Sequence, residues 1–275
     1  MSSINLNLSS LNTQRNLSAS QNAVGQGMQH LSSGLRVNSS KDDAAGLAIA
    51  ERIGSQAKGM NVAMRNANDA VSLAQTAEGA LGKVSDMLQR MRELALQASN
   101  GSNNAADRAN LDAEFQQVGQ EISRTLAGAR FNDKNILGAD AGTLSFQVGA
   151  STGASDSITI TTARLDNHAT ITAVTTGSLT LAGTALLAVD HIDAAINLVV
   201  SERANLGAAQ GRFESAITLL QVSAEKSAGT RSRIVDADFA SETASLSRAQ
   251  VLQQAGTAML AQANQTPNQV LTLLR

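Results

Sequence analysis

The sequence predicts a mainly α fold, a long antiparallel helical coiled-coil bundle with a small β-hairpin region. Three observations predict it. An unbroken heptad series covers residues 60–98, a matching series returns over residues 192–220, and strand-like alternation occurs only between them. Because an apolar residue about every 3.5 positions keeps one stripe facing a partner, both series predict long helices that lie against other helices.

The chain opens with a weakly charged helix. Apolar residues repeat on one of its faces at heptad spacing, namely Leu17, Val24 and Leu31. Gly34 indicates where this helix ends. The residues that follow end in Asp42 and Asp43, which resemble acids in the first turn of a new helix, where the helix dipole favours negative charge. A second helix is therefore predicted over about residues 42–99.

The second predicted helix carries the long seam. Most seam positions hold alanine, so a partner backbone can come close, although each methyl contributes only about 0.8 kcal/mol. The seam consists of Met60, Ala63, Ala67, Ala70, Ala74, Ala77, Leu81, Val84, Leu88, Met91, Ala95 and Ala98. After a turn at residues 101–104, a third helix is predicted to fold back as an antiparallel hairpin. Its stripe consists of Leu111, Phe115, Val118, Ile122, Leu126 and Ala129.

The periodicity changes at about residue 131, and a β part is predicted over about residues 131–190. Apolar residues alternate with polar ones in two short runs, which predict a β-hairpin. These residues are Leu144, Phe146 and Val148, then Ile158 and Ile160. A further strand is predicted near residues 171–174.

Helical heptads then return, interrupted at Glu202, and form the natural partner of the first seam. They consist of Ile192, Ala195, Val199, Leu206, Ala209, Phe213, Ala216 and Leu220. A last helix carries Val251, Leu252, Ala255, Ala258 and Met259 on one face. This order predicts a terminal helical domain of residues 1–43 and 235–275, and a helical rod domain of residues 44–234.

Both ends of the chain are poor in charge and in large apolar residues. Arg15 and Arg36 are the charged residues of positions 1–40. Such segments bury too little surface to offset backbone ordering, which costs about 1–2 kcal/mol per residue. Two interpretations stay open at this point: disordered tails, or tails that fold only when packed with neighbours.

Composition excludes several classes of function. The net charge is −2, aromatic residues make up 2%, and cysteine is absent, so nucleic-acid binding, thiolate metal sites and cysteine nucleophiles are not expected. His30, His168 and His191 have no metal-ligand spacing and are expected at the surface. No zinc-protease or nucleotide-binding motif occurs. We therefore expect a non-enzyme without catalytic residues, metal or cofactor.

No apolar run approaches the roughly 18 residues of a membrane span, so no membrane insertion is expected.

One charged helix face has two possible interpretations. Arg90, Glu93, Leu94 and Gln97 lie at positions i, i+3, i+4 and i+7 beside the seam, and Glu114 approaches them if the next helix folds back. A solvated face with weak ion pairs is one interpretation. The apolar Leu94, which lies off the seam, favours a contact surface.

Several segments at both ends resemble the bacterial flagellins. In the N-terminal half they are LSSGLRVN at residues 31–38 and DDAAGLAI at residues 42–49, preceded by matching residues at 4–5 and 10–14. In the C-terminal half they are ANLGA at 204–208, RFE at 212–214, SRIVDADFA at 232–240, QQAG at 253–256 and AQANQ at 261–265. The resemblance covers nearly the whole chain except about residues 140–190, so it implies a short flagellin without a large outer insert.

The resemblance implies the structural subunit of the bacterial flagellar filament, a secreted homopolymer that serves swimming motility. The paired terminal helices would line the filament channel, and the heptad helices and β part would surround it. Flagellins leave the cell unfolded through the flagellar type III export channel, which agrees with the absence of a Sec-type signal at the start of this sequence. Implied partners are further copies of the chain, an export chaperone, the hook–filament junction and cap proteins, and host Toll-like receptor 5.

The resemblance also assigns residues to these partners. Subunit contact and receptor recognition map to Gln89, Arg90, Arg92, Glu93, Leu94, Gln97 and Glu114. Contact with the chaperone and within the terminal domain maps to Val251, Leu252, Met259, Val270, Leu271, Leu273, Leu274 and Arg275. The alternative function is a hook–filament junction protein, which shares the terminal helices.

Overall fold

The computed structural model describes residues 6–273, and the surroundings of side chains up to residue 265. The long helices are α1 (Leu8–Ser33), α2 (Ala44–Ala98), α3 (Ala105–Gly128), α5 (Ala182–Val235) and α6 (Phe239–Leu273), with a short α4 (Ala169–Thr175). The strands are β1 (Arg130–Phe131), β2 (Lys134–Asn135), β3 (Thr143–Gln147) and β4 (Ser157–Thr161), and a 3-10 turn, η1, covers Ala154–Asp156. The predicted mainly α class with a small antiparallel strand region is confirmed.

The chain divides into two compact units. Unit 1 comprises residues 1–56 and 226–275, and unit 2 comprises residues 57–225, so the boundaries fall inside α2 and α5. The predicted domain boundaries at 43/44 and 234/235 describe roles in a filament and stay a prediction.

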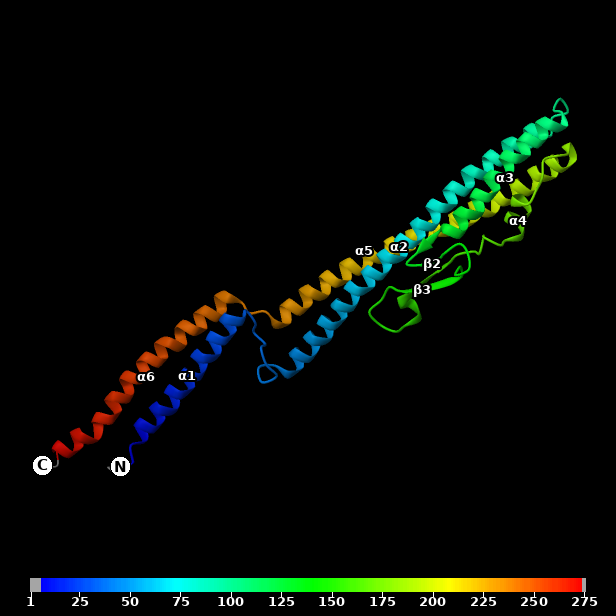
Figure 1. Cartoon of the computed structure of the whole chain (residues 1–275). Coiled ribbons are helices and arrows are strands. Elements are labelled where there is room, and N and C mark those ends of the chain that lie inside the picture. The colour runs from blue at the N-terminus through cyan, green and yellow to red at the C-terminus, as the bar shows by residue number, and fades with distance from the viewer. Residues whose placement is uncertain (1–5, 274–275) are drawn as a thin grey trace. The chain divides into compact units, whose positions relative to one another are not determined.

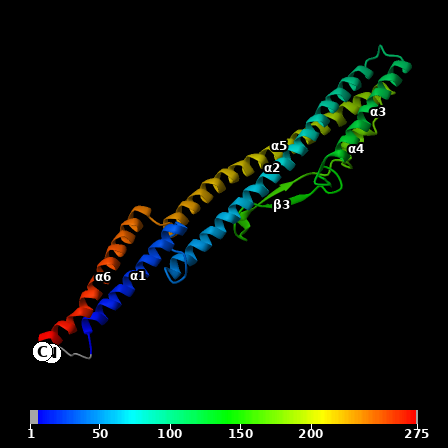
Figure 2. The ribbon, with the colours of Figure 1, turned by 60° about the vertical axis from the view of Figure 1, so that its left-hand side comes forward.

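In unit 2, helices α2, α3 and α5 lie side by side (Figures 1 and 2). The predicted seam of α2 is buried at every position from Ala63 to Ala98, and Met60 at its start is half-buried. The returning stripe of α5 is buried from Ile192 to Phe213, except that Glu202 is half-buried. Polar contacts confirm that the two helices are neighbours: Gln210 Nε2 donates to Glu78 Oε2 at 3.1 Å, and Arg92 bonds Asp193.

Helix α2 also carries a second buried stripe, which the sequence analysis missed. Leu73 and Leu94 are buried, and Ala80 and Met87 are partly buried against the core. This stripe lies on the α3 side, because Ala80 shares a hollow with Thr125 of α3 and Arg90 bonds Glu114 of α3. Its heptad spacing of 73, 80, 87 and 94 was visible in the sequence, so α2 packs against two helices at once.

Helix α3 begins with a capping box between Asn104 and Asp107 and buries its predicted stripe at Phe115, Ile122 and Leu126. Gly119 is also buried, with the Cα of Thr175 only 3.4 Å from the place where a Cβ would stand. A small residue is therefore needed where the end of α4 crosses α3.

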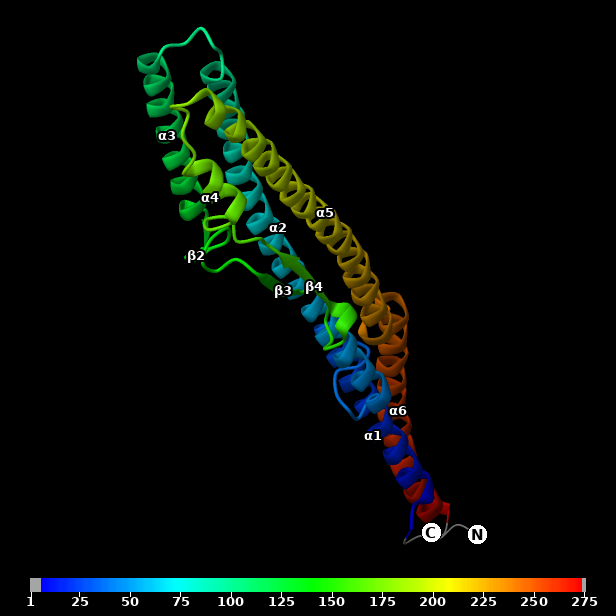
Figure 3. The ribbon, with the colours of Figure 1, turned by 90° about the vertical axis from the view of Figure 1, so that its right-hand side faces the viewer.

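The β part contains the predicted hairpin and one correction. Strands β3 and β4 pair antiparallel, with Leu144 opposite Ile160 and Phe146 opposite Ile158, and lie along α2 (Figure 3). The ring of Phe146 meets Phe213 of α5 edge-on, with centroids 5.8 Å apart. This contact fixes the hairpin on the helices.

The strand predicted near residues 171–174 is wrong, because helix α4 occupies this segment. Its buried residues, Ile171 and Val174, are three positions apart, which suits a helix face and not a strand. His168 supplies the cap, since its Nδ1 accepts from the Thr170 N–H at 3.3 Å. Threonine and alanine dominate this stretch, and their propensities did not separate helix from strand.

In unit 1, α1 and α6 lie side by side (Figure 1), which confirms the predicted pairing of the terminal helices. Each helix meets the other with a heptad stripe made largely of small or polar residues, most of which are half-buried. In α1 the stripe is Ser10, Thr13, Leu17, Ser20, Val24, Gly27 and Leu31, and in α6 it is Glu242, Leu246, Ala249, Gln253, Gly256, Leu260 and Ala263. Side chains this small let the helices approach, but the pair buries little apolar surface.

The connection between α1 and α2 differs in detail from the prediction. Gly34 ends α1 in the left-handed conformation, with φ of 70°, as expected. Helix α2 begins at Ala44, so Asp42 and Asp43 precede its first turn. Asp43 Oδ1 caps the helix by accepting from the Gly46 N–H at 2.8 Å, and Asp42 accepts the backbone N–H groups of Ser39 and Asn38. These hydrogen bonds lower the pKa of Asp42 below its ordinary value.

Helix α5 is more apolar than the sequence analysis expected. Among the described residues it is the helix that is long and apolar enough to cross a membrane by length and composition, with a mean hydropathy of 1.4 over its best window. Two features of unit 2 account for this. The heptad stripe is buried in the core, and Leu186 and Leu187 add exposed apolar surface on the other side.

Leu88→Ala is expected to destabilise unit 2 by about 2–5 kcal/mol, because Leu88 is fully buried (0% exposed) in the seam and its truncation leaves a cavity. The matched control is Leu96→Ala on the same helix, where the side chain is exposed and the change should stay within about 0.5 kcal/mol. Urea unfolding followed by circular dichroism measures both. Equal effects of the two variants would contradict the assignment of the seam.

Candidate interaction surfaces

A charged surface in unit 2 joins α2 to α3. Arg90 of α2 donates from Nε and Nη2 to Glu114 Oε1 of α3, at 3.0 and 2.7 Å, and from Nη1 to Glu93 Oε2 at 3.0 Å. The predicted approach of Glu114 to this face is therefore confirmed. We call this the α2–α3 surface and define it by Gln89, Arg90, Glu93, Leu96, Gln97 and Glu114.

Electrostatics hold the Arg90 side chain in place. Its hydrogen bonds to Glu114 and then to Glu93 raise the pKa of Arg90 above its ordinary value. All three side chains are still widely exposed, so the ion pairs are screened by water and contribute little to stability. What they supply is a fixed geometry: a guanidinium held between two carboxylates and open to solvent.

The apolar member of this surface differs from the prediction. Leu94 is buried, with 1% exposure, in the second stripe of α2 and is not available to a partner. Leu96, two positions further along α2, is 44% exposed. The sequence analysis chose Leu94 because it lies off the α5 seam, but it did not identify the second stripe that faces α3.

Arg92 also differs from the other predicted residues. Its Nε donates to Asp193 Oδ1 of α5 at 2.6 Å, and its Nη2 lies 3.3 Å from Oδ2. The two hydrogen bonds between the Arg92 guanidinium and the Asp193 carboxylate hold α2 against α5. They also raise the pKa of Arg92 above its ordinary value. Arg92 therefore stands outside the α2–α3 surface, because it is directed to α5 and not to α3.

Several of the larger apolar residues of unit 1 face outward. Val251, Leu252 and Met259 of α6 are exposed, because the buried stripe of α6 lies on another face. Leu8, Leu11 and Met28 of α1 are exposed as well. Of the other residues predicted for terminal contacts, the side chains of Val270, Leu271 and Leu273 and the whole of Leu274 and Arg275 lie outside the described residues.

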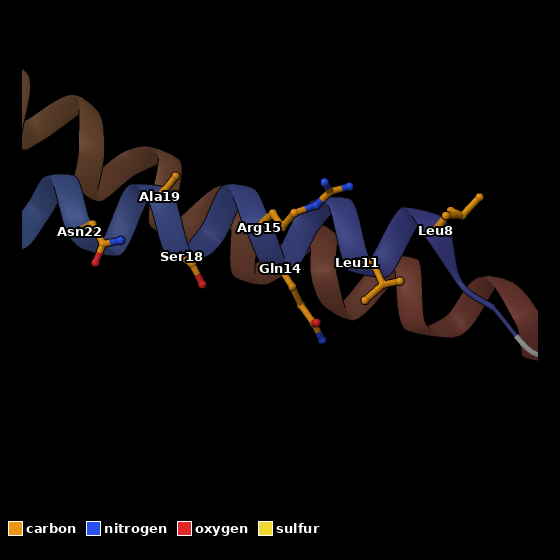
Figure 4. Close-up of a pocket in the computed structure, with 7 residues that line it drawn as sticks. All are labelled: Leu8, Leu11, Gln14, Arg15, Ser18, Ala19 and Asn22. Atoms are coloured by element: carbon orange, nitrogen blue, oxygen red, sulfur yellow. The ribbon is translucent and has the colours of Figure 1, made fainter.

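The outer face of α1 carries a shallow hollow of about 630 Å³. Figure 4 shows that its lining side chains come from successive turns of one helix and do not converge on a common point. Arg15 is the ionisable residue that lines the hollow. The guanidinium of Arg15 donates a hydrogen bond to Asn12 Oδ1 of the same helix. This geometry suits an extended contact along the helix better than a small-molecule site.

Polar contacts fasten α1 to α6. Asn7 Nδ2 donates to the carbonyl of Ala263 at 2.8 Å, and Ser10 Oγ donates to Asn264 Oδ1 at 2.8 Å. His30 Nδ1 lies 3.2 Å from Glu242 Oε1.

The prediction of a surface His30 is wrong, since its exposure is 8%. Its burial follows from its position beside Gly27 and Leu31 on the paired face.

The other histidines have separate roles. His168 is half-buried as the cap of α4, and His191 is exposed on α5. Within residues 6–273, no group of three or more histidine or acidic side chains is placed to hold a metal ion.

Comparison with known proteins identifies the family. The family model for the bacterial flagellin N-terminal helical region matches residues 4–141, and the model for the C-terminal helical region matches residues 189–274. A flagellin of Halalkalibacterium halodurans is 44% identical over 272 residues, which cover 99% of both chains. Flagellin C of Vibrio cholerae is 33% identical, with 98% of this chain and 99% of the relative covered.

Solved structures agree with this assignment. A crystal structure of Bacillus cereus flagellin is similar with a TM-score of 0.50 and 32% identity, over 56% of this chain and 88% of that one. A putative flagellar hook-associated protein of Vibrio parahaemolyticus has a TM-score of 0.59 over 71% of this chain and 100% of its own. Its 14% identity shows a shared fold alone.

Both family models match in chain order, and full-length relatives match across the variable middle as well. The prediction that the protein is not an enzyme is confirmed by this assignment. The chain belongs to the bacterial flagellin family, whose members are structural subunits of the flagellar filament.

Proposed function

We propose that this chain polymerises with copies of itself into a bacterial flagellar filament, mainly through α1 and α6. The observation that carries the proposal is the distribution of apolar residues in unit 1. The paired face holds mostly serine, glycine, alanine and other small or polar side chains, while Val251, Leu252 and Met259 point outward. A helix pair with this arrangement gains apolar burial only by packing against further molecules.

The proposal gives the two regions the roles that the flagellin family implies. Residues 1–43 and 235–275 would line the filament channel, and residues 44–234 would surround them. Unit 2 has a large buried core of its own, whereas unit 1 buries few apolar side chains. The second interpretation of the weakly charged ends, that they gain stability with their neighbours, is the one this arrangement supports.

Export is part of the proposal. A chain without cysteine and with weakly packed ends suits secretion in an unfolded state through the type III channel. Before export, a chaperone would cover the outward face of α6, because exposed Val251, Leu252 and Met259 form a helical apolar stripe. At its ends the filament would meet the hook–filament junction and cap proteins.

The α2–α3 surface is proposed to serve both subunit contact and recognition of monomers by Toll-like receptor 5. Support comes from Arg90, which is fixed by Glu114 and Glu93 yet open to solvent. Arginine is one of the residues enriched in binding hot spots, and one that is already held in place loses less side-chain freedom on binding.

A hook–filament junction protein is the alternative function. Its structural support is the fold shared with the hook-associated protein at 14% identity. The flagellin relative matches 99% of the chain at 44% identity, which favours the filament subunit.

Self-assembly separates the two functions and tests the role of unit 1. Monomer dissociated by heat and then cooled with filament seeds should form long filaments, which electron microscopy and sedimentation detect. Gly27→Leu should prevent this, because a Cβ at residue 27 already meets Glu242 and Leu246 at 3.5 Å and a larger side chain would separate α1 from α6. The matched control is Gly27→Ala, whose methyl fits at ordinary contact distance and should allow assembly.

Wild-type protein that stays monomeric with intact termini would favour the junction function. Filaments formed equally well by Gly27→Leu would contradict the role of the α1–α6 pair.

Receptor recognition is tested with Arg90→Ala combined with Glu114→Ala. We expect activation of Toll-like receptor 5 by monomer to fall about tenfold or more, because both the guanidinium and its anchoring carboxylate are removed. A reporter cell line measures the response. Arg124→Ala is the control, since Arg124 is an exposed arginine of α3 whose partner, Glu121, lies on the same helix. Unchanged activation by the double variant would rule out this receptor surface.

A further inference from the structure

The turn between α2 and α3 contains the single Asn–Gly dipeptide of the chain, Asn100–Gly101. Both residues are exposed, and both lie outside the helices that they connect. Neither the proposed function nor the packing of unit 2 uses this pair.

The turn does not require a glycine at position 101. Gly101 has no positive φ, since the glycines with positive φ are Gly34 and Gly142. A Cβ built on Gly101 would meet no atom within 4 Å. What glycine provides here is an open backbone nitrogen, with no side chain to shield it from the preceding residue.

The side chain of Asn100 is folded back toward that nitrogen. Its Oδ1 accepts from the Ser102 N–H at 3.2 Å, so the carboxamide lies over the backbone that follows it. Among the described residues, no protein acceptor is found for the Gly101 N–H itself. The hydrogen bond from Ser102 holds the carboxamide on the side of Asn100 where the chain continues through Gly101, and it polarises the side-chain carbonyl.

We propose that Asn100 is a site of spontaneous deamidation in this protein. The backbone nitrogen of Gly101 attacks Cγ of Asn100, a new N–C bond closes a five-membered succinimide, and the side-chain amide group leaves as ammonia with the displaced proton. Water then adds to one of the two ring carbonyls and opens the ring. The products are aspartate or, when the other bond breaks, isoaspartate, so the net change is the uptake of water and the loss of ammonia.

The product changes the turn in two ways. Either form adds a negative charge just after the C-terminus of α2, where the helix carbonyls already carry partial negative charge. The isoaspartate form also lengthens the main chain by a methylene group. Position 100 continues the line of Glu93 and Gln97 at helical spacing, so the new charge would border the α2–α3 surface. The chemistry itself does not depend on the proposed function.

The same turn supplies internal controls. Asn103 is followed by asparagine, and its Nδ2 donates to the Gln97 carbonyl at 2.6 Å. Asn104 is followed by alanine, and its Oδ1 accepts from the Asp107 N–H at 2.8 Å as the cap of α3. Both side chains are thus held by other groups, and the residues after them carry a Cβ.

The experiment is timed incubation of the purified full-length protein in mildly alkaline buffer, followed by rapid trypsin digestion and mass spectrometry. Cleavage after Arg92 and Arg108 places all three asparagines in one peptide, and fragment ions locate the modified residue. We expect modification to accumulate at Asn100 ahead of Asn103 and Asn104, with isoaspartate detected by chromatographic separation of the isomeric peptides. Modification at Asn100 no faster than at its two neighbours would overturn the proposal.

Gly101→Ala tests the structural reason. The variant should fold unchanged, because its methyl meets no atom, and modification at Asn100 should slow roughly tenfold. Circular dichroism checks the fold. An unchanged rate at Asn100 in a folded Gly101→Ala protein would show that glycine at this position does not promote attack, and would contradict the proposed mechanism.

Discussion

Helix α2 buries two stripes at the same time, and unit 2 depends on this double packing. One stripe, rich in alanine, lies against α5, and the other, with Leu73 and Leu94, lies against α3. Alanine allows close approach at the first contact, while larger residues fill the second. Because both stripes belong to one helix, the positions of α3 and α5 are coupled. The hairpin of β3 and β4 then attaches through Phe146 to α5.

Unit 1 shows the opposite balance. Its helix pair uses serine, glycine and polar contacts such as His30 with Glu242, and exposes several larger apolar residues. Folding free energy comes chiefly from apolar burial, so such a pair is weakly stable alone and improves on association. In the proposed filament, unit 2 would contribute its own buried core, and unit 1 would gain apolar burial from neighbouring subunits.

Much of the fold could be predicted because heptad spacing reports directly on helix packing. The seam of α2, the stripes of α3 and α5 and the existence of the hairpin all follow from period and alternation. The segment at residues 169–175 could not be predicted, since threonine-rich sequences suit both helix and strand until a buried neighbour selects one. The candidate site was predicted in part: Arg90 and Glu114 do meet, but Leu94 is replaced by Leu96.

The sequence by itself determined the five long helices, their pairing partners, the position of the β part and the flagellin family, because these depend on periodicity and on long motifs. The tertiary structure alone decided which off-seam residues face solvent. Leu94 and Leu96 differ by two positions on one helix, yet one is buried and the other exposed, because α3 covers only one side of α2. His30 likewise became buried only because α6 lies across it. A residue's own periodicity shows that it has a neighbour, but the neighbour's position decides how much of it remains accessible.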